Sequence, residues 1–178
     1  DWSSDVCSSD LGENKIHRQH QFNMNTPSQI PQELLECWTR QSNALLTSYF
    51  TLFGQELISR TYHSRQDAEG LFSANFAVIS HGVESDPLLN YANKFALNLW
   101  GFDPLILIST PSRLTAEPKA QNERDRILKE TQRKGFFKNY EGVRISAKGR
   151  RFIISNVTIW NVSGTCGEPL GQIGRAHV

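Results

Sequence analysis

The sequence has no apolar run that approaches the roughly 18 residues needed to span a bilayer, so it predicts no membrane span. Lysine and arginine number 19 and aspartate and glutamate 18, a balance that argues against nucleic acid or an anionic membrane as the main partner. The three cysteines show no CxxC or Cys/His spacing, which argues against a disulfide framework or a structural zinc site. No signal peptide follows the single methionine, Met24, so we expect a soluble cytoplasmic protein.

Catalytic motifs are missing as well. The sequence contains no glycine-rich phosphate loop, no HExxH and no GxSxG, the patterns that mark nucleotide, zinc and serine-hydrolase chemistry. No constellation supplies a nucleophile, a base and a group that orients the base. We therefore expect no enzymatic activity and no metal site.

Both ends of the chain resemble translated sequencing-adapter DNA. The string DVCSSD at residues 5–10 and the string IGRAHV at residues 173–178 can be encoded as reverse complements at every position. We therefore set residues 1–11 and 173–178 apart as adapter-derived. Residues 12–30 are polar and are expected to form a disordered leader, with Met24 as the natural start. Alternatively, residues 12–23 are a genuine disordered tail.

The remaining pattern predicts an α+β domain. Apolar residues three and four apart predict an N-terminal helical segment over residues 31–58, and Gly54 is expected to interrupt or end it. A short helix near 67–72 and an irregular apolar stretch at 102–114 connect the other elements. The expected strands are 76–80, 88–91, 136–146, 151–162 and a last strand truncated at 172, and the other expected helices are 93–100 and 115–134.

Three blocks of sequence carry a family resemblance. They are SHGVESDPLLNYANKFALNLW at 80–100, PSRLTAEP at 111–118 and GVRISAKGRRFIISNVTIWN at 142–161. Together they resemble the MEKHLA domain of the stand-alone bacterial type, a relative of the PAS sensory fold. The resemblance implies a PAS-like domain over residues 71–172. It also implies a five-stranded antiparallel sheet covered on one face by short helices, with a ligand cavity between them and an N-terminal helix outside.

Six residues are candidates for binding a ligand in that cavity: His81, Asn93, Trp100, Arg113, Thr158 and Trp160. His81 ends a strand near the expected cavity mouth, where it either binds a metal or haem or acts as a pH switch, or fixes the turn through Ser80 and Asp86. Asn93 matches the asparagine that opens this helix in PAS-like sequences, with a structural role through its side-chain hydrogen bonds.

The other candidates also have two readings. Trp100 and Trp160 either pack the core or form an aromatic wall for a flat ligand, with Thr158 on the same strand face as Trp160. Arg113 either pairs with Glu117 or binds an anionic ligand. The basic cluster of the last hairpin is expected to be solvated, with phosphate or an acidic partner as the alternative; it comprises Arg144, Lys148, Arg150 and Arg151.

Two functions compete on these observations. The first is a non-enzymatic sensory module of the PAS type that binds a small apolar or planar molecule and signals through its leading helix and protein contacts. The NCRFLQ-type motif of flavin-binding photosensory domains is absent, and the cofactor stays unknown.

The second is a ligand-free dimerisation module. The MEKHLA domain is known as the C-terminal domain of plant class III homeodomain–leucine zipper regulators, where it is thought to influence dimerisation. This chain has no homeodomain and no heptad zipper, so DNA binding does not carry over. The apolar stripe of residues 34–53 would then be the surface of a homodimer.

Overall fold

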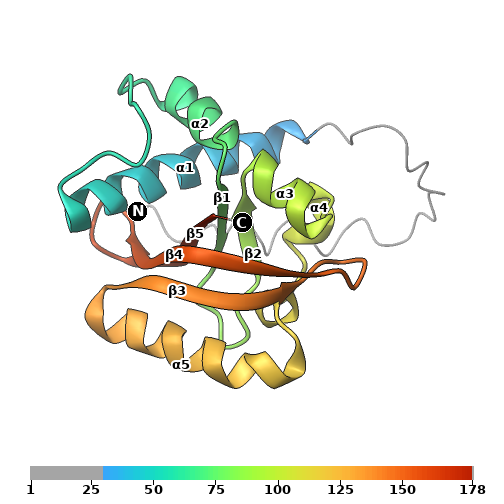
Figure 1. Ribbon diagram of the computed structural model, residues 1–178. Coiled ribbons are helices and arrows are strands. Elements are labelled where there is room, and N and C mark those ends of the chain that lie inside the picture. The colour runs from blue at the N-terminus through green and yellow to red at the C-terminus, as the bar shows by residue number, and fades with distance from the viewer. Residues whose placement is uncertain (1–29, 178) are drawn as a thin grey trace.

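The computed structural model describes residues 30–177 (Figure 1). Five strands form one antiparallel sheet, as the family resemblance implies, and their spatial order is β2-β1-β5-β4-β3. The helices are α1 (Gln32–Phe53), α2 (Ser64–Phe72), α3 (Lys94–Trp100), α4 (Pro104–Leu107), the 3-10 turn η1 (Ser112–Thr115) and α5 (Pro118–Lys134). The strands are β1 (Ala77–His81), β2 (Leu89–Ala92), β3 (Phe136–Ile145), β4 (Arg151–Ser163) and β5 (Pro169–His177).

Helix α1 buries the stripe that its apolar spacing predicts. Leu34, Trp38, Leu45 and Tyr49 are buried against the rest of the domain, and the Trp38 indole donates to the Asn90 carbonyl of β2 at 2.9 Å. The helix ends earlier than residue 58, because Gly54 takes a left-handed φ of 66° and its N–H caps the Phe50 carbonyl. Most of the stripe is therefore part of the core, while Leu35, Phe50 and Leu52 stay exposed.

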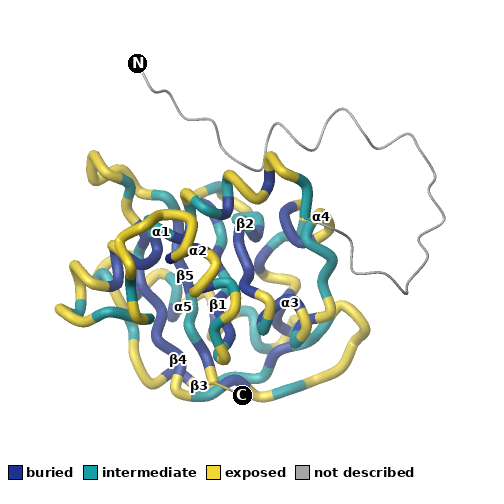
Figure 2. Tube along the Cα trace, turned by 90° about the horizontal axis from the view of Figure 1, so that it is seen from above, coloured by how far each residue is buried: buried dark blue, intermediate teal, exposed yellow. Residues whose placement is uncertain are grey.

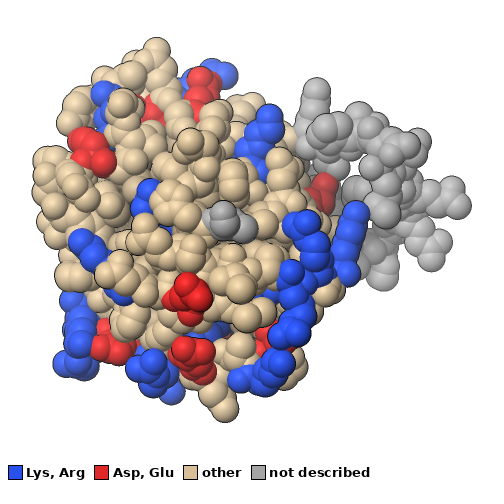
Figure 3. All heavy atoms as spheres, viewed as in Figure 1, with Lys and Arg blue, Asp and Glu red and all other residues tan. Residues whose placement is uncertain are grey.

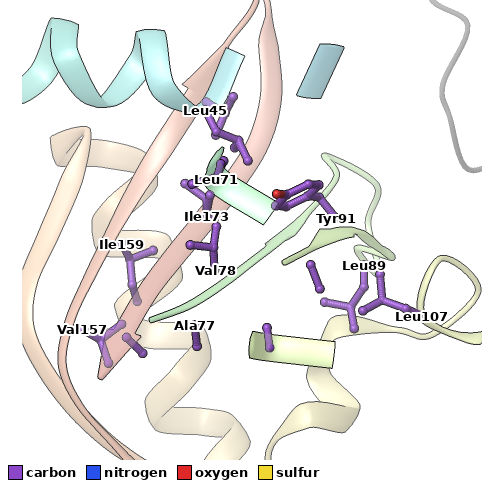
Figure 4. Close-up of a cluster of buried hydrophobic side chains, with 14 of the residues drawn as sticks. Leu45, Leu71, Ala77, Val78, Leu89, Tyr91, Leu107, Val157, Ile159 and Ile173 are labelled. Atoms are coloured by element: carbon purple, nitrogen blue, oxygen red, sulfur yellow. The ribbon is translucent and has the colours of Figure 1, made fainter. Parts of the chain in front are cut away.

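The two faces of the sheet carry different helices. Helices α1 and α2 lie above β4, and α5 lies below β3 (Figure 1). Trp100 of α3 and Ile127 of α5 line one cavity, so both helices cover the face opposite α1. Figure 4 shows Leu45 and Leu71 pointing at Val78 and Ile173 of the sheet. Figure 2 shows buried residues concentrated in β1, β2 and the second half of β4, while β3 and the loops are more exposed. The sheet is thus covered on both faces, which fits the mixed apolar pattern of its strands.

Asparagine side chains fasten the helices to the sheet. Asn93 caps α3 by accepting from the Ala96 N–H at 3.0 Å, and it also accepts from the Val78 N–H and donates to the Phe76 carbonyl. Helix α5 is held at its C-terminal end, where Asn161 donates to the Thr131 carbonyl at 3.1 Å. These bonds set the distance between the sheet and the helices of its second face.

A bulge in β4 changes which residues share a face. Two steps along β5, from His177 to Arg175, oppose three steps along β4, from Ser155 to Thr158. Asn156 lies within this bulge in the left-handed conformation, with φ 49°. Strict alternation predicts that Ile154 and Trp160 share a face. Because the bulge adds one residue, that prediction is wrong, and the two side chains point to opposite sides of the sheet.

The last strand extends beyond the end that the sequence predicts. Strand β5 continues to His177, and Ile173 is only 1% exposed in the core. Residues 173–177, set apart above as adapter-derived, therefore pair with β1 and β4; their proposed origin in adapter DNA stays a prediction. The predicted adapter segment 1–11, the start at Met24 and nearly all of the predicted leader lie outside the described residues.

No helix within residues 30–177 has the length and apolar character that crossing a membrane requires.

Candidate functional site

A small cavity lies between the sheet and the helices of its second face. Strands β1, β3, β4 and β5 form its floor, and Trp100 of α3, the turn η1 and helix α5 form its roof. Its volume is about 80 Å³, room for roughly three water molecules at about 30 Å³ each. Pockets that hold drug-sized ligands measure about 300–1,000 Å³, so a flavin-sized molecule does not fit this cavity.

Arg124 projects from α5 into the cavity and is only 8% exposed. One guanidinium nitrogen, Nη2, donates to Ser112 Oγ at 2.7 Å, and Nη1 reaches the carboxylate of Asp125 at 3.2 Å. Burial lowers the pKa of Arg124, and the nearby charge of Arg144 lowers it further, while Asp125 acts in the opposite direction. The positive charge of Arg124 is therefore only partly balanced by negative charge nearby.

Arg144 enters the cavity from β3 and is 6% exposed. Its Nη1 donates to the Val143 carbonyl at 2.9 Å and to Tyr140 Oη at 3.3 Å, and its guanidinium carbon lies 5.3 Å from the centroid of the Tyr140 ring. Gly142 lies between the two residues, and a Cβ there would overlap Tyr140 Oη. A residue without a side chain is therefore needed for Tyr140 and Arg144 to meet.

His81 lines the same cavity at the end of β1. Its Nδ1 lies 2.9 Å from the Gly82 carbonyl, which can only accept, so Nδ1 carries the proton and Nε2 has the lone pair in the neutral ring. Nε2 is buried and has no hydrogen-bond partner within residues 30–177. Burial, the largest effect, and the charge of Arg124 lower the pKa of His81, against the opposing effects of the Gly82 carbonyl and Glu84.

Trp100 forms part of the roof. It is 2% exposed and packs edge-on against Phe152, with ring centroids 5.0 Å apart. Its indole N–H is buried without an acceptor in the described part of the chain. A buried donor without a partner costs about 1–3 kcal/mol, so an acceptor that entered the cavity near this group would gain a hydrogen bond.

The structure brings together only two of the six candidate residues, His81 and Trp100. Trp160 is fully buried on the opposite face, where it contacts Tyr49 and Phe53 of α1, and Thr158 lies next to it along β4 outside the cavity lining. The aromatic wall of Trp100 with Trp160 therefore does not form.

Asn93 and Arg113 also lie outside the lining. Asn93 is fully buried and engaged in the bonds that join α3 to β1. Arg113 pairs with Asp86, its Nε lying 3.1 Å from both carboxylate oxygens, and both side chains are about half exposed. Arg113 forms an ion pair, as one of the two interpretations expects, but its partner is Asp86 rather than Glu117.

Sequence reasoning missed the two arginines of the cavity. Arg144 was grouped with the solvated cluster of the hairpin, but only Lys148, Arg150 and Arg151 of that cluster are exposed. A signal was present for each arginine. Arg124 falls on the apolar stripe of its helix, four residues after Ala120 and three before Ile127. Arg144 lies four residues after Tyr140 on the same strand, a spacing that places both side chains on one face.

Charges elsewhere are mixed and mostly solvated. Figure 3 shows basic and acidic side chains interspersed over the face that carries α5, and basic side chains gathered on the side of the β3–β4 hairpin. Within α5, Glu130 lies close to both Arg126 and Lys134. Among the described residues, no three His, Cys, Asp or Glu side chains gather as a metal site would require.

A second hollow of about 430 Å³ lies between α1 and α2. The charged and polar residues on its rim pair with one another: Arg65 with Glu69 at 3.2 Å and Gln32 with Glu36 at 2.9 Å. Both pairs are exposed, and the buried polar group left over here is the neutral Tyr91 hydroxyl, which has no hydrogen-bond partner among residues 30–177. The cavity with Arg124 and Arg144 is the better candidate site.

Comparison with known families and structures agrees with this geometry. The profile of the MEKHLA domain matches residues 39–175. The PAS domain of a protein from Colwellia psychrerythraea superposes with a TM-score of 0.56 at 15% identity, over 64% of this chain and 93% of that one. None of the curated proteins matches the chain.

Two further solved structures are similar at the level of the fold. The Cys71Ser mutant of Vivid superposes with a TM-score of 0.53 at 16% identity, over 75% of this chain and 99% of that one. An RNA-binding light-oxygen-voltage receptor gives 0.54 at 16% identity over 68% of this chain, which spans about a third of that receptor (34%). Neither Cys37 nor Cys166 lines the cavity described above.

Proposed function

The chain belongs to the MEKHLA domain family, and we propose that it is a sensory module of the PAS type. It takes a small molecule into the cavity under α3, η1 and α5 and passes the occupancy of that cavity to a partner protein. The observation that carries this proposal is the convergence of buried polar groups on one internal space. Arg124, Arg144 and the unpartnered Nε2 of His81 all meet there, which is typical of a binding site.

Strand β4 offers a route from the cavity to the leading helix. Val157 and Ile159 line the cavity, while Trp160 of the same strand packs against Tyr49 of α1 with ring centroids 5.0 Å apart. Because close-packed interiors transmit displacement, a ligand that moves β4 also moves the packing of α1. Helix α1 is therefore the proposed output element.

The module is proposed to bind its ligand without transforming it. Two aliphatic hydroxyl groups of the lining are already engaged, since Ser112 Oγ accepts from Arg124 and Thr115 Oγ1 donates to the Ser112 carbonyl at 2.7 Å. Neither hydroxyl is paired with a base, as a nucleophile would need to be.

A screen for thermal stabilisation by small molecules, together with native mass spectrometry of the full chain, tests the proposal. Ala77 lines the cavity and is 1% exposed, so Ala77→Leu should fill it and abolish saturable stabilisation. Ala147→Leu, at an exposed hairpin residue, is the matched control and should bind as the parent does. If no compound stabilises the parent, or if Ala77→Leu responds equally, the proposal fails.

The alternative is a ligand-free dimerisation module. Its predicted surface is buried within the domain, but Leu35 and Phe50 of α1 remain 40% and 47% exposed. Light scattering at increasing concentration distinguishes the two functions. A dimer that Phe50→Ser dissociates would favour this alternative, and a monomer at every concentration would rule it out.

A further inference from the structure

Two buried guanidinium groups share the cavity, and no carboxylate within the described residues pairs with both. Arg124 has Asp125, whose side chain is 53% exposed and belongs to the next residue of the same helix. The hydrogen bonds of Arg144 go to two neutral oxygens, Tyr140 Oη and the Val143 carbonyl. Buried charges in proteins are ordinarily paired, so this site is short of one negative charge.

The electrostatic consequence points to an anion. Burial and the charge of Arg144 both lower the pKa of Arg124, which means that the ionised forms of the two arginines destabilise each other. A negative charge placed between them would relieve that repulsion and replace the water lost on burial. The unpartnered indole N–H of Trp100 supplies a further donor in the lining.

Most of the remaining lining is apolar. Ile127 comes from α5, Ile154 and Val157 from β4, and Ile79 from β1. The cavity therefore offers a cationic part for a charged group and an apolar part for a short hydrocarbon tail. Its volume of about 80 Å³ is about half that of a roughly 150 Å³ cavity that holds benzene, so it restricts the ligand to a few non-hydrogen atoms.

We propose that the cavity binds a small monocarboxylic acid, with Arg124 and Arg144 holding the carboxylate and Ile127, Ile154 and Val157 packing against the tail. This inference rests on the proposed function, because it names the ligand class of the same cavity. A planar carboxylate matches the planar fork of a guanidinium. Phosphate or sulfate alone would leave the apolar wall without contacts.

Calorimetric titration of the full chain compares acetate, propionate, butyrate and benzoate with phosphate and with butyramide, the neutral isostere of butyrate. Affinity should rise with tail length up to the capacity of the cavity and fall for benzoate. Butyrate should bind at least about tenfold more tightly than butyramide, because charge-assisted hydrogen bonds are the stronger ones. Phosphate should bind more weakly than butyrate.

Substitution of Arg144 tests whether the buried arginines bind the carboxylate. Arg144→Met should reduce butyrate affinity by at least about tenfold while the chain stays folded, since replacing a buried charge by an apolar residue is often tolerated. Arg126→Met on the outer side of α5, where the Arg126 side chain is 66% exposed, is the matched control and should leave affinity unchanged.

These experiments distinguish failure of the carboxylate inference from failure of the proposed sensory function. Equal binding of butyrate and butyramide, tighter binding of phosphate, or full butyrate affinity in Arg144→Met would overturn the carboxylate inference and leave the sensory module standing. Binding of no small molecule, charged or neutral, would overturn both. If Arg144→Met does not fold, the comparison of butyrate with butyramide on the parent chain decides the question by itself.

Discussion

Arg124 Nη2 donates to Ser112 Oγ at 2.7 Å, and this bond ties helix α5 to the crossover turn η1 above the cavity. Both residues are buried, Ser112 at 1% exposure. The bond thus links two elements that form the roof of the candidate site.

Loss of that acceptor should destabilise the fold. Ser112→Ala leaves a buried guanidinium donor without a partner, which costs about 1–3 kcal/mol. Urea denaturation measures the change, and Ser109→Ala at an exposed position of the same crossover should stay within about 0.5 kcal/mol. Equal effects of the two substitutions would contradict the role assigned to Ser112.

Asn93 should prove important for stability and not for ligand binding. Asn93→Ala removes the cap of α3 and leaves the buried Val78 N–H without its acceptor, a combined cost of about 2–4 kcal/mol. Asn122→Ala, exposed on α5, is the control for thermal denaturation. A stable Asn93→Ala protein that has lost ligand binding would show that the structural role is wrong.

His81 should make stability depend on pH. Its pKa in the folded protein lies below the ordinary value of about 6.5, so the unfolded chain takes up the proton first as the pH falls. Stability should therefore be full above about pH 6.5 and decline as the pH falls toward the lower folded pKa. Melting temperatures between pH 7.5 and 5 should decline less in His81→Asn.

The control for this measurement is His63→Asn, at an exposed residue before α2, which should keep the decline of the parent protein. Saturating butyrate should raise the pKa of His81, because it adds a negative charge to the cavity beside Arg124. An unchanged decline in His81→Asn would mean that other groups govern the pH dependence.

Arg113 should contribute little to stability or to ligand binding. Its pair with Asp86 is exposed, with side chains 47% and 50% accessible, and such pairs contribute about 0–1 kcal/mol. The free energy of unfolding of Arg113→Met should therefore lie within about 1 kcal/mol of that of the parent. Its affinity for butyrate in calorimetry should be unchanged. A tenfold loss of affinity would place Arg113 in the binding site after all.

Asn156 should tolerate glycine and reject a β-branched residue. At φ 49°, the left-handed conformation costs an ordinary side chain about 1–2 kcal/mol, so Asn156→Val should be destabilised by that amount while Asn156→Gly stays close to the parent. Urea midpoints give the comparison, and Ser155→Val, outside the left-handed region, is the control. If valine is tolerated equally at both positions, the bulge does not depend on Asn156.

Local chemistry predicted the elements and several of their ends. The apolar spacing of α1, the left-handed Gly54 that ends it and the cap supplied by Asn93 all act within a few residues along the chain. Such signals are local, so they can be read without knowledge of the tertiary contacts. The five-stranded antiparallel sheet was implied by the family resemblance, and the structure shows it.

The site residues were predicted less well, for a physical reason in each case. Trp160 was assigned to the cavity because strict alternation takes no account of a bulge, and the left-handed Asn156 turned it to the opposite face. Arg144 was assigned to solvent because it was grouped with the basic residues of the hairpin, of which Arg150 and Arg151 are indeed exposed. Arginine can occur in solvent or in a buried site, and residue type alone does not distinguish the two.

The amino-acid sequence by itself determined the order of helices and strands, their caps and the family of the fold, because these depend on neighbours in the chain. Only the tertiary structure decided that Arg124 from α5 and Arg144 from β3 meet in one buried space. That meeting depends on how far a bulged, twisted sheet lies from the helix above it, and no short segment of sequence specifies that distance.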